Sequence, residues 1–166
     1  MNKGRTIRSY DYVNHSYEAV RDALSAGETT VYHNATKAAE LHAHAVTSEL
    51  RVDIGGIKVG TDIAISVKKI EDRPKEGTSP PMARFKLEWA STKLPSLFPF
   101  MNAELSIYPL TGRETQIDFL GTYEPPMGLL GDALDAVIGH RIAEASVHQF
   151  IKNVGAYLRS ELPNQE

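Results

Sequence analysis

The hydrophobic and polar positions of the chain change their period along its length, and these changes mark the expected elements. Residues 6–13, TIRSYDYV, are rich in β-branched and aromatic residues and predict a first strand. Residues 17–26, YEAVRDALSA, place their apolar side chains on one face and predict a short amphipathic helix. The stretch 28–45 contains both extended-type and helix-type sequence, and we expect part of it to form a second short helix.

From about residue 46 the period becomes two, which indicates a series of antiparallel strands. The alternation leads up to Gly55-Gly56, a dipeptide suited to a hairpin turn, and continues beyond it. Strands with one apolar and one polar face belong to a sheet that meets water on one side. Leu120 is the one apolar residue on a polar face of the later strands. The inward faces expected for those strands are Ala83, Phe85, Leu87 and Trp89; Met101, Ala103, Leu105 and Ile107; and Thr115, Ile117, Phe119 and Gly121.

The last part of the chain predicts one long helix, which begins after Pro125-Pro126 and ends before Pro163. Roughly 30 residues at about 1.5 Å per residue give about 45 Å, enough to cross the sheet and cover its apolar face. Apolar residues recur along this helix at spacings of three and four. They are Leu130, Leu134, Val137, Ile138, Ile142, Ala145, Phe150, Ile151, Val154 and Leu158.

Composition excludes several classes of protein without changing this picture. The chain has 166 residues, a formal net charge of −3 and no cysteine. We therefore expect a single domain over residues 1–166, without disulfides, thiolate metal sites or iron–sulfur clusters. Lysines and arginines are dispersed, so we expect no nucleic-acid partner. The chain has no signal-peptide pattern and no apolar run of transmembrane length, so we expect a cytoplasmic protein without a membrane span.

The order of these elements, together with LGTYEPPMGLLGDALDAVIGHRIAEASVHQFI at residues 120–151, resembles the START-like superfamily, also called SRPBCC. This group includes polyketide cyclase-like and birch-pollen-allergen-like proteins. The resemblance implies an α+β helix-grip fold, in which a curved antiparallel sheet of about six strands wraps around a long carboxy-terminal helix. Two short helices would follow the first strand. It also implies a hydrophobic ligand held between that helix and the concave face of the sheet.

The apolar strand faces and the apolar stripe of the helix converge, which predicts an internal cavity for such a ligand. Tyr123 at the exit of the last strand and Arg141 beside an apolar position are possible polar contacts to the ligand. Gly139 within the helix either leaves room for the ligand or permits close packing against a strand. The predicted cavity-lining residues are Phe85, Trp89, Leu105, Phe119, Val137, Ile138 and Ile142.

Motifs that carry chemistry are scarce. The sequence has no nucleophile elbow, phosphate-binding glycine loop or dinucleotide fingerprint, so we assign no catalytic residue and no cofactor. His42 and His44 lie two residues apart, and His140, Glu144 and His148 lie four apart, but neither set completes a metal-binding pattern. We expect no bound metal and interpret the second set as the edge of the polar helix face, where i,i+4 charge pairs form.

Three function classes follow from these observations. We favour a non-catalytic carrier or sensor of an apolar small molecule, such as a lipid, a polyketide or an aromatic-like compound. The enzymatic alternative is a polyketide cyclase or dehydratase, which would need tyrosine, histidine or arginine side chains directed inward for proton transfer. The remaining alternative is a protein-interaction module whose cavity is vestigial. The sequence leaves the ligand's identity and the oligomeric state open.

Overall fold

The computed structural model describes residues 4–26, 40–42, 45–54, 57–92, 100–124 and 132–163. Within these ranges seven strands form one sheet, and two helices accompany it. The elements are β1 (Arg5–Val13), α1 (Tyr17–Ala26), β2 (Glu40–His42), β3 (Ala45–Ile54), β4 (Ile57–Arg73), β5 (Met82–Ser91), β6 (Phe100–Thr111), β7 (Glu114–Glu124) and α3 (Asp132–Glu161). Neighbouring strands are antiparallel, and the strand order is β1-β7-β6-β5-β4-β3-β2.

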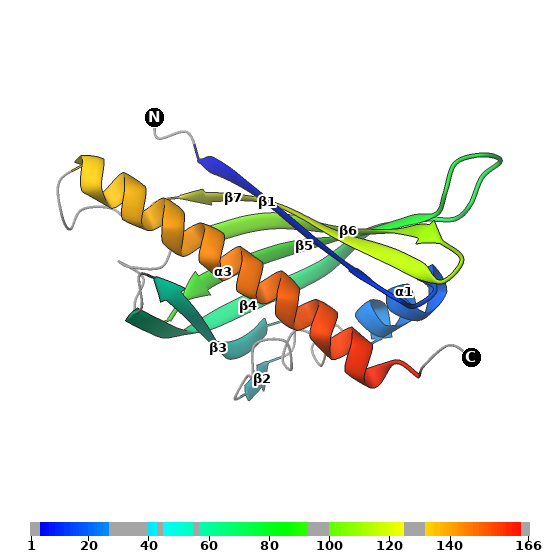
Figure 1. Ribbon diagram of the computed structural model, residues 1–166, viewed down its shortest axis with the longest axis horizontal. Helices are drawn as coiled ribbons and strands as arrows, with labels where there is room; N and C mark the ends of the chain where they lie inside the picture. The colour runs from blue at the N-terminus through cyan, green and yellow to red at the C-terminus, as the bar shows by residue number, and fades with distance from the viewer. Residues whose placement is uncertain are drawn as a thin grey trace.

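The helix-grip arrangement is confirmed. Figure 1 shows α3 running diagonally across one face of the sheet. The helix has 30 residues and ends before Pro163. It contacts β1 and β7 at one side of the sheet and β3 near the other side. Because β1 and β3 lie near opposite ends of the strand order, the sheet holds the helix from both sides.

The expected short helix after the first strand is present as α1. It is capped by Ser16, whose Oγ accepts a hydrogen bond from the Ala19 amide at 3.3 Å. Of the second helix expected within 28–45, residues 28–39, 43 and 44 lie outside the described residues. Glu40–His42 form the short strand β2, which pairs with the start of β3 and brings the described strands to seven rather than about six.

The strand registers follow the predicted alternation. Ile54 pairs with Ile57 at the end of the β3–β4 ladder, and the predicted turn at Gly55-Gly56 lies outside the described residues. Every residue expected on the inward faces of β5, β6 and β7 is buried, whereas Leu120 is 49% exposed on the opposite face. These inward faces form the floor of the core. The buried side chains of α3 that cover this floor are Ile142, Ala143, Val147, Phe150, Ile151, Val154 and Leu158.

Candidate functional site

Three aromatic rings join α3 to the sheet, and we call them the aromatic cluster. Trp89 on β5 lies 5.7 Å from Phe119 on β7 and 5.2 Å from Phe150 on α3, measured between ring centroids. Phe119 and Phe150 are 6.1 Å apart. None of the three residues is more than 3% exposed. Offset and edge-on contacts of this kind are the favoured geometries for aromatic rings, so the cluster anchors the helix on the sheet.

The predicted lining residues with described side chains lie together in this core. Phe85 pairs with Leu105 across β5 and β6, and Leu105 pairs with Phe119 across β6 and β7. These three residues form a row on the inner face and have no exposed surface. Trp89 lies in the aromatic cluster, and Ile142 is buried on α3. The structure therefore brings these five residues into one core.

The remaining lining residues are on the amino-terminal part of α3. The side chains of Val137 and Ile138 and the surroundings of Gly139 lie outside the described residues. The cavity itself stays a prediction. Arg141, the second possible polar contact, is exposed on α3.

A polar chain of three side chains borders this apolar core. The hydroxyl oxygen of Tyr123, at the end of β7, lies 2.9 Å from Nδ1 of His140 on α3. The other ring nitrogen of His140, Nε2, lies 3.1 Å from the Glu144 carboxylate one helical turn later. Tyr123 has no exposed surface, whereas the side chains of His140 and Glu144 are 36% and 50% exposed. We call this set the Tyr123–His140–Glu144 chain; it runs from the core to the surface.

The carboxylate determines which way the hydrogens point in this chain. Ionised Glu144 can only accept, so Nε2 of His140 carries a hydrogen and donates it to the carboxylate. In the neutral ring Nδ1 then has no hydrogen and accepts one from the Tyr123 hydroxyl. The Tyr123–His140–Glu144 chain can therefore pass a proton between the buried phenol of Tyr123 and the half-exposed carboxylate of Glu144.

Arg5 on β1 is the further partner of the phenol. Burial raises the pKa of Tyr123 above that of an ordinary phenol, the nearby charge of Glu144 adds to this rise, and the charge and hydrogen bond of Arg5 oppose it. Because the net direction is upward, the phenol keeps its proton at neutral pH. Tyr123 thus donates to His140, accepts from Arg5, and connects β1, β7 and α3.

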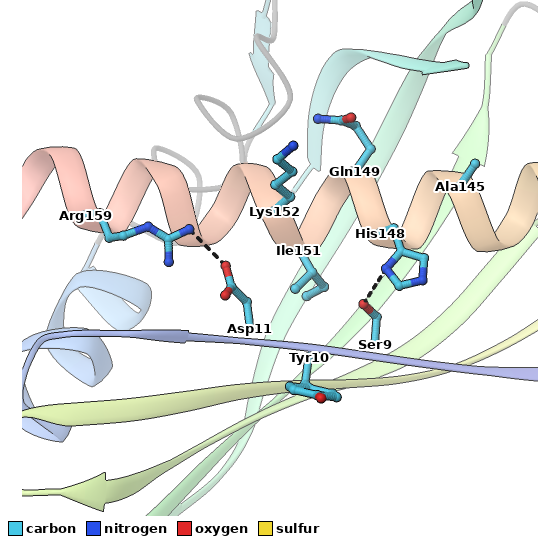
Figure 2. Close-up of a pocket in the computed structure, with 9 residues that line it drawn as sticks. All are labelled: Ser9, Tyr10, Asp11, Ala145, His148, Gln149, Ile151, Lys152 and Arg159. Atoms are coloured by element: carbon cyan, nitrogen blue, oxygen red, sulfur yellow. Dashed lines mark hydrogen bonds and ion pairs between the residues drawn. The ribbon is translucent and has the colours of Figure 1, made fainter. Parts of the chain in front are cut away.

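A groove of about 600 Å³ lies between α3 and the edge strand β1. Figure 2 shows Ser9 and Asp11 of β1 facing His148 and Arg159 of α3. Ser9 Oγ lies 3.2 Å from His148 Nδ1, and the Asp11 carboxylate forms an ion pair of 3.0 Å with Arg159. Arg159 also donates to the Tyr12 carbonyl oxygen at 2.8 Å. These contacts hold β1 against the helix.

The predicted helix stripe of His140, Glu144 and His148 therefore forms an ion pair within the helix and also contacts two strands. Its i,i+4 pair between His140 and Glu144 is present, as expected for the edge of a polar face. Sequence reasoning did not link His140 to Tyr123, or His148 to Ser9, because these partners lie 17 and 139 residues apart along the chain. Across the described residues, no group of three or more histidine, aspartate or glutamate side chains could hold a metal ion.

Comparison with known proteins identifies the fold. No family model and no curated protein matches the chain. Among solved structures, the Zhui aromatase/cyclase from a Streptomyces species has a TM-score of 0.53 at 11% identity, with 93% of each chain covered. Ara h 8.0201 has a TM-score of 0.51 at 8% identity and covers 95% of this chain and 99% of its own.

The chain has the helix-grip fold of these two proteins. A protein from Thermus thermophilus is also similar in fold, with a TM-score of 0.54, 15% identity, and 94% of this chain and 98% of that chain covered. At these identities the likeness concerns the fold alone. Among the described residues, no helix is long and apolar enough to cross a membrane.

Proposed function

We propose that the protein binds a hydrophobic small molecule, of the lipid, polyketide or aromatic kind, between α3 and the concave face of the sheet. The observation that carries the proposal is the convergence of the apolar faces of β5, β6 and β7 on the apolar stripe of α3. The sequence-predicted cavity residues would line the site. Tyr123, the buried phenol at its border, would offer the ligand a polar contact.

The close packing of the core means that side chains must move before such a ligand can enter. Phe85, Leu105 and Phe119 have no exposed surface, so a ligand in contact with them must displace side chains of α3 or of the aromatic cluster. Binding would then select a more open arrangement of helix and sheet, at a cost set by the packing that is lost. A ligand that fills the opened space would recover that apolar contact.

Native mass spectrometry of the recombinant protein, followed by solvent extraction and identification of any bound molecule, tests the proposal directly. A titration with the fluorescent hydrocarbon diphenylhexatriene gives an affinity for comparing variants. We expect Trp89→Leu to change this affinity several-fold, because Trp89 belongs to the proposed lining. Leu120→Ala, on the exposed face, is the matched control and should leave it unchanged. A folded protein that carries no molecule and binds no probe would contradict the proposal.

A second candidate function is a dehydratase or cyclase reaction, and the Tyr123–His140–Glu144 chain is the observation that favours it. Dehydration of a β-hydroxy ketone removes an α proton and a hydroxyl group as water and leaves a conjugated double bond. Protonated Tyr123 would donate its proton to the departing hydroxyl, and His140 with Glu144 would return a proton to the phenol from solvent. The α proton would pass to water.

The enzymatic candidate is tested by the ultraviolet absorbance of the conjugated product formed from an aromatic β-hydroxy ketone. Tyr123→Phe should abolish the protein-dependent rate. Glu144→Gln should lower it by less than the roughly 100-fold at the bottom of the range for a direct acid–base group, because Glu144 acts through His140. Tyr10→Phe, at an exposed tyrosine of β1, is the control. Tight binding of the ketone without any product would favour the carrier.

A further inference from the structure

Ser146 on α3 carries a hydroxyl group that has no partner. The residue is 1% exposed, and its Oγ makes no hydrogen bond in the structure. Serine within a helix commonly donates to the carbonyl four residues earlier, but Ser146 does not. Two other buried hydroxyls among the described residues do have partners: Thr115 donates to the His15 carbonyl at 2.9 Å, and Ser9 contacts His148. Among the described residues, Ser146 shares this property only with Tyr17, whose hydroxyl is also buried without a partner.

The position of Ser146 on the helix directs it toward the sheet. Residues four apart lie on one face of a helix, so Ser146 lies between Ile142 and Phe150. Ile142 is buried, and Phe150 contacts both Trp89 and Phe119 in the aromatic cluster. The unpaired hydroxyl thus belongs to the apolar stripe with which α3 covers the sheet. The other unpaired buried atoms among the described residues, in Tyr17 and Arg73, lie on α1 and β4.

We infer that the Ser146 hydroxyl is the polar anchor of the ligand site, where it forms a hydrogen bond with an oxygen atom of an otherwise apolar ligand. This inference rests on the proposed function. A buried hydroxyl without a partner destabilises the unliganded protein, and a ligand oxygen at this point would remove that cost. The protein would therefore bind ligands that place an oxygen between the helix and the sheet more tightly than ligands that do not.

The surroundings of Ser146 define the chemical class of the ligand. The residues four positions to either side are apolar and buried, and neither can balance a charge. An ionised group at this point would remain unpaired in an apolar environment, which is strongly unfavourable. The ligand group is therefore a neutral keto, ester or hydroxyl oxygen within a hydrophobic framework.

The experiment compares two dyes that differ in hydrogen bonding: prodan, which carries a ketone, and the hydrocarbon diphenylhexatriene. Each is titrated into the wild-type protein, Ser146→Ala and Ser146→Cys. The matched control is Ser160→Ala, because Ser160 is an exposed serine on the same helix that already donates to the Tyr157 carbonyl at 2.9 Å. Thermal melts of all the proteins establish that each variant is folded.

We expect Ser146→Ala to weaken prodan binding about fivefold, equivalent to about 1 kcal/mol, and to leave diphenylhexatriene binding unchanged. The emission of bound prodan should shift to the blue, because its carbonyl loses a hydrogen bond. The unliganded variant should melt at a higher temperature than the wild type, because the unpaired group has been removed. Ser146→Cys should give intermediate values, and Ser160→Ala should match the wild type.

The outcomes separate the anchor from the binding function. Equal effects of Ser146→Ala on both dyes, or no effect on either, would overturn the anchor while leaving the proposed function intact. Wild-type binding of the hydrocarbon but not of the ketone would do the same. Failure of the wild type to bind either dye, together with no bound molecule by native mass spectrometry, would overturn both.

Discussion

Tyr123 and His140 meet across the contact between β7 and α3, with 2.9 Å between the phenol oxygen and Nδ1. We expect Tyr123→Phe to lower the free energy of unfolding by about 1 kcal/mol, because the variant loses the hydrogen bond between the Tyr123 hydroxyl and His140. Urea denaturation measures the loss. Tyr10→Phe, at a tyrosine that is 67% exposed, is the control and should be near neutral.

A double-mutant cycle tests whether this effect comes from the contact itself. If the Tyr123–His140 hydrogen bond is the cause, the combined variant Tyr123→Phe with His140→Ala should lose less stability than the sum of the two single variants. We expect a coupling of about 0.5 to 1.5 kcal/mol. Strict additivity would show that the two residues stabilise the fold independently.

Gly121 on β7 lies beside two buried side chains, Phe119 of the same strand and Met101 of β6. A Cβ atom at this position would lie 2.7 Å from Cε1 of Phe119 and 2.8 Å from Sδ of Met101, and both residues are fully buried. Gly121→Ala should therefore destabilise the protein by about 1 to 3 kcal/mol through overpacking. Gly112→Ala is the control, because no atom lies within 4 Å of its Cβ. Equal thermal stability of the two variants would show that Phe119 and Met101 move aside freely.

Phe150 supplies the α3 side of the aromatic cluster. Phe150→Ala should lower the free energy of unfolding by about 3 to 5 kcal/mol, since it removes a buried ring and leaves a cavity. The same substitution at Phe100, which is 41% exposed, should cost much less. Chemical denaturation of both variants gives the comparison, and similar losses would contradict the central place of Phe150 in the core.

Two buried phenols should make the fold sensitive to alkaline pH. Burial raises the pKa of Tyr123 and also that of Tyr17, where the charge of Asp72 adds to the rise. A raised pKa means that the folded state keeps the proton while the unfolded chain loses it. The stabilisation is complete below the ordinary phenol pKa of about 10 and is lost as pH rises through the folded-state values.

A spectrophotometric titration of phenolate absorbance measures this effect. Tyr123→Phe and Tyr17→Phe should each remove one late-ionising group, and the wild-type free energy of unfolding should fall as pH rises above about 10. The Tyr10→Phe variant should retain both late groups. Ionisation of all tyrosines in the folded wild-type protein at the pH found for the unfolded chain would contradict the prediction.

The sequence by itself determined the first strand, the short helix after it, the later strands with their inward faces, and the long helix. Alternation of apolar and polar residues is a local consequence of the strand period, so the buried faces of β5, β6 and β7 could be predicted residue by residue. The exposure of Leu120 followed from the same pattern. The long helix could be predicted because its apolar spacing and the prolines that bound it are also local signals.

The tertiary structure decided how wide the buried arc of α3 is. Ala143 and Val147 are buried although they lie outside the predicted stripe, whereas Ala145 within that stripe is only half-buried. The reason is that the sheet reaches the helix from β1 and from β3, so more than one face of the helix is covered. Helical periodicity predicts that an apolar face exists, but the curvature of the sheet determines how far around the helix it extends.

Only the tertiary structure placed the polar groups of the candidate site. Tyr123 could be predicted as a contact at the end of its strand, but its pairing with His140 depends on how α3 crosses β7. The contact of Ser9 with His148 likewise depends on β1 pairing with β7 at the sheet edge. No local pattern distinguishes Ser146 from other serines, because a hydroxyl becomes unpaired only when the surrounding core excludes both water and partners.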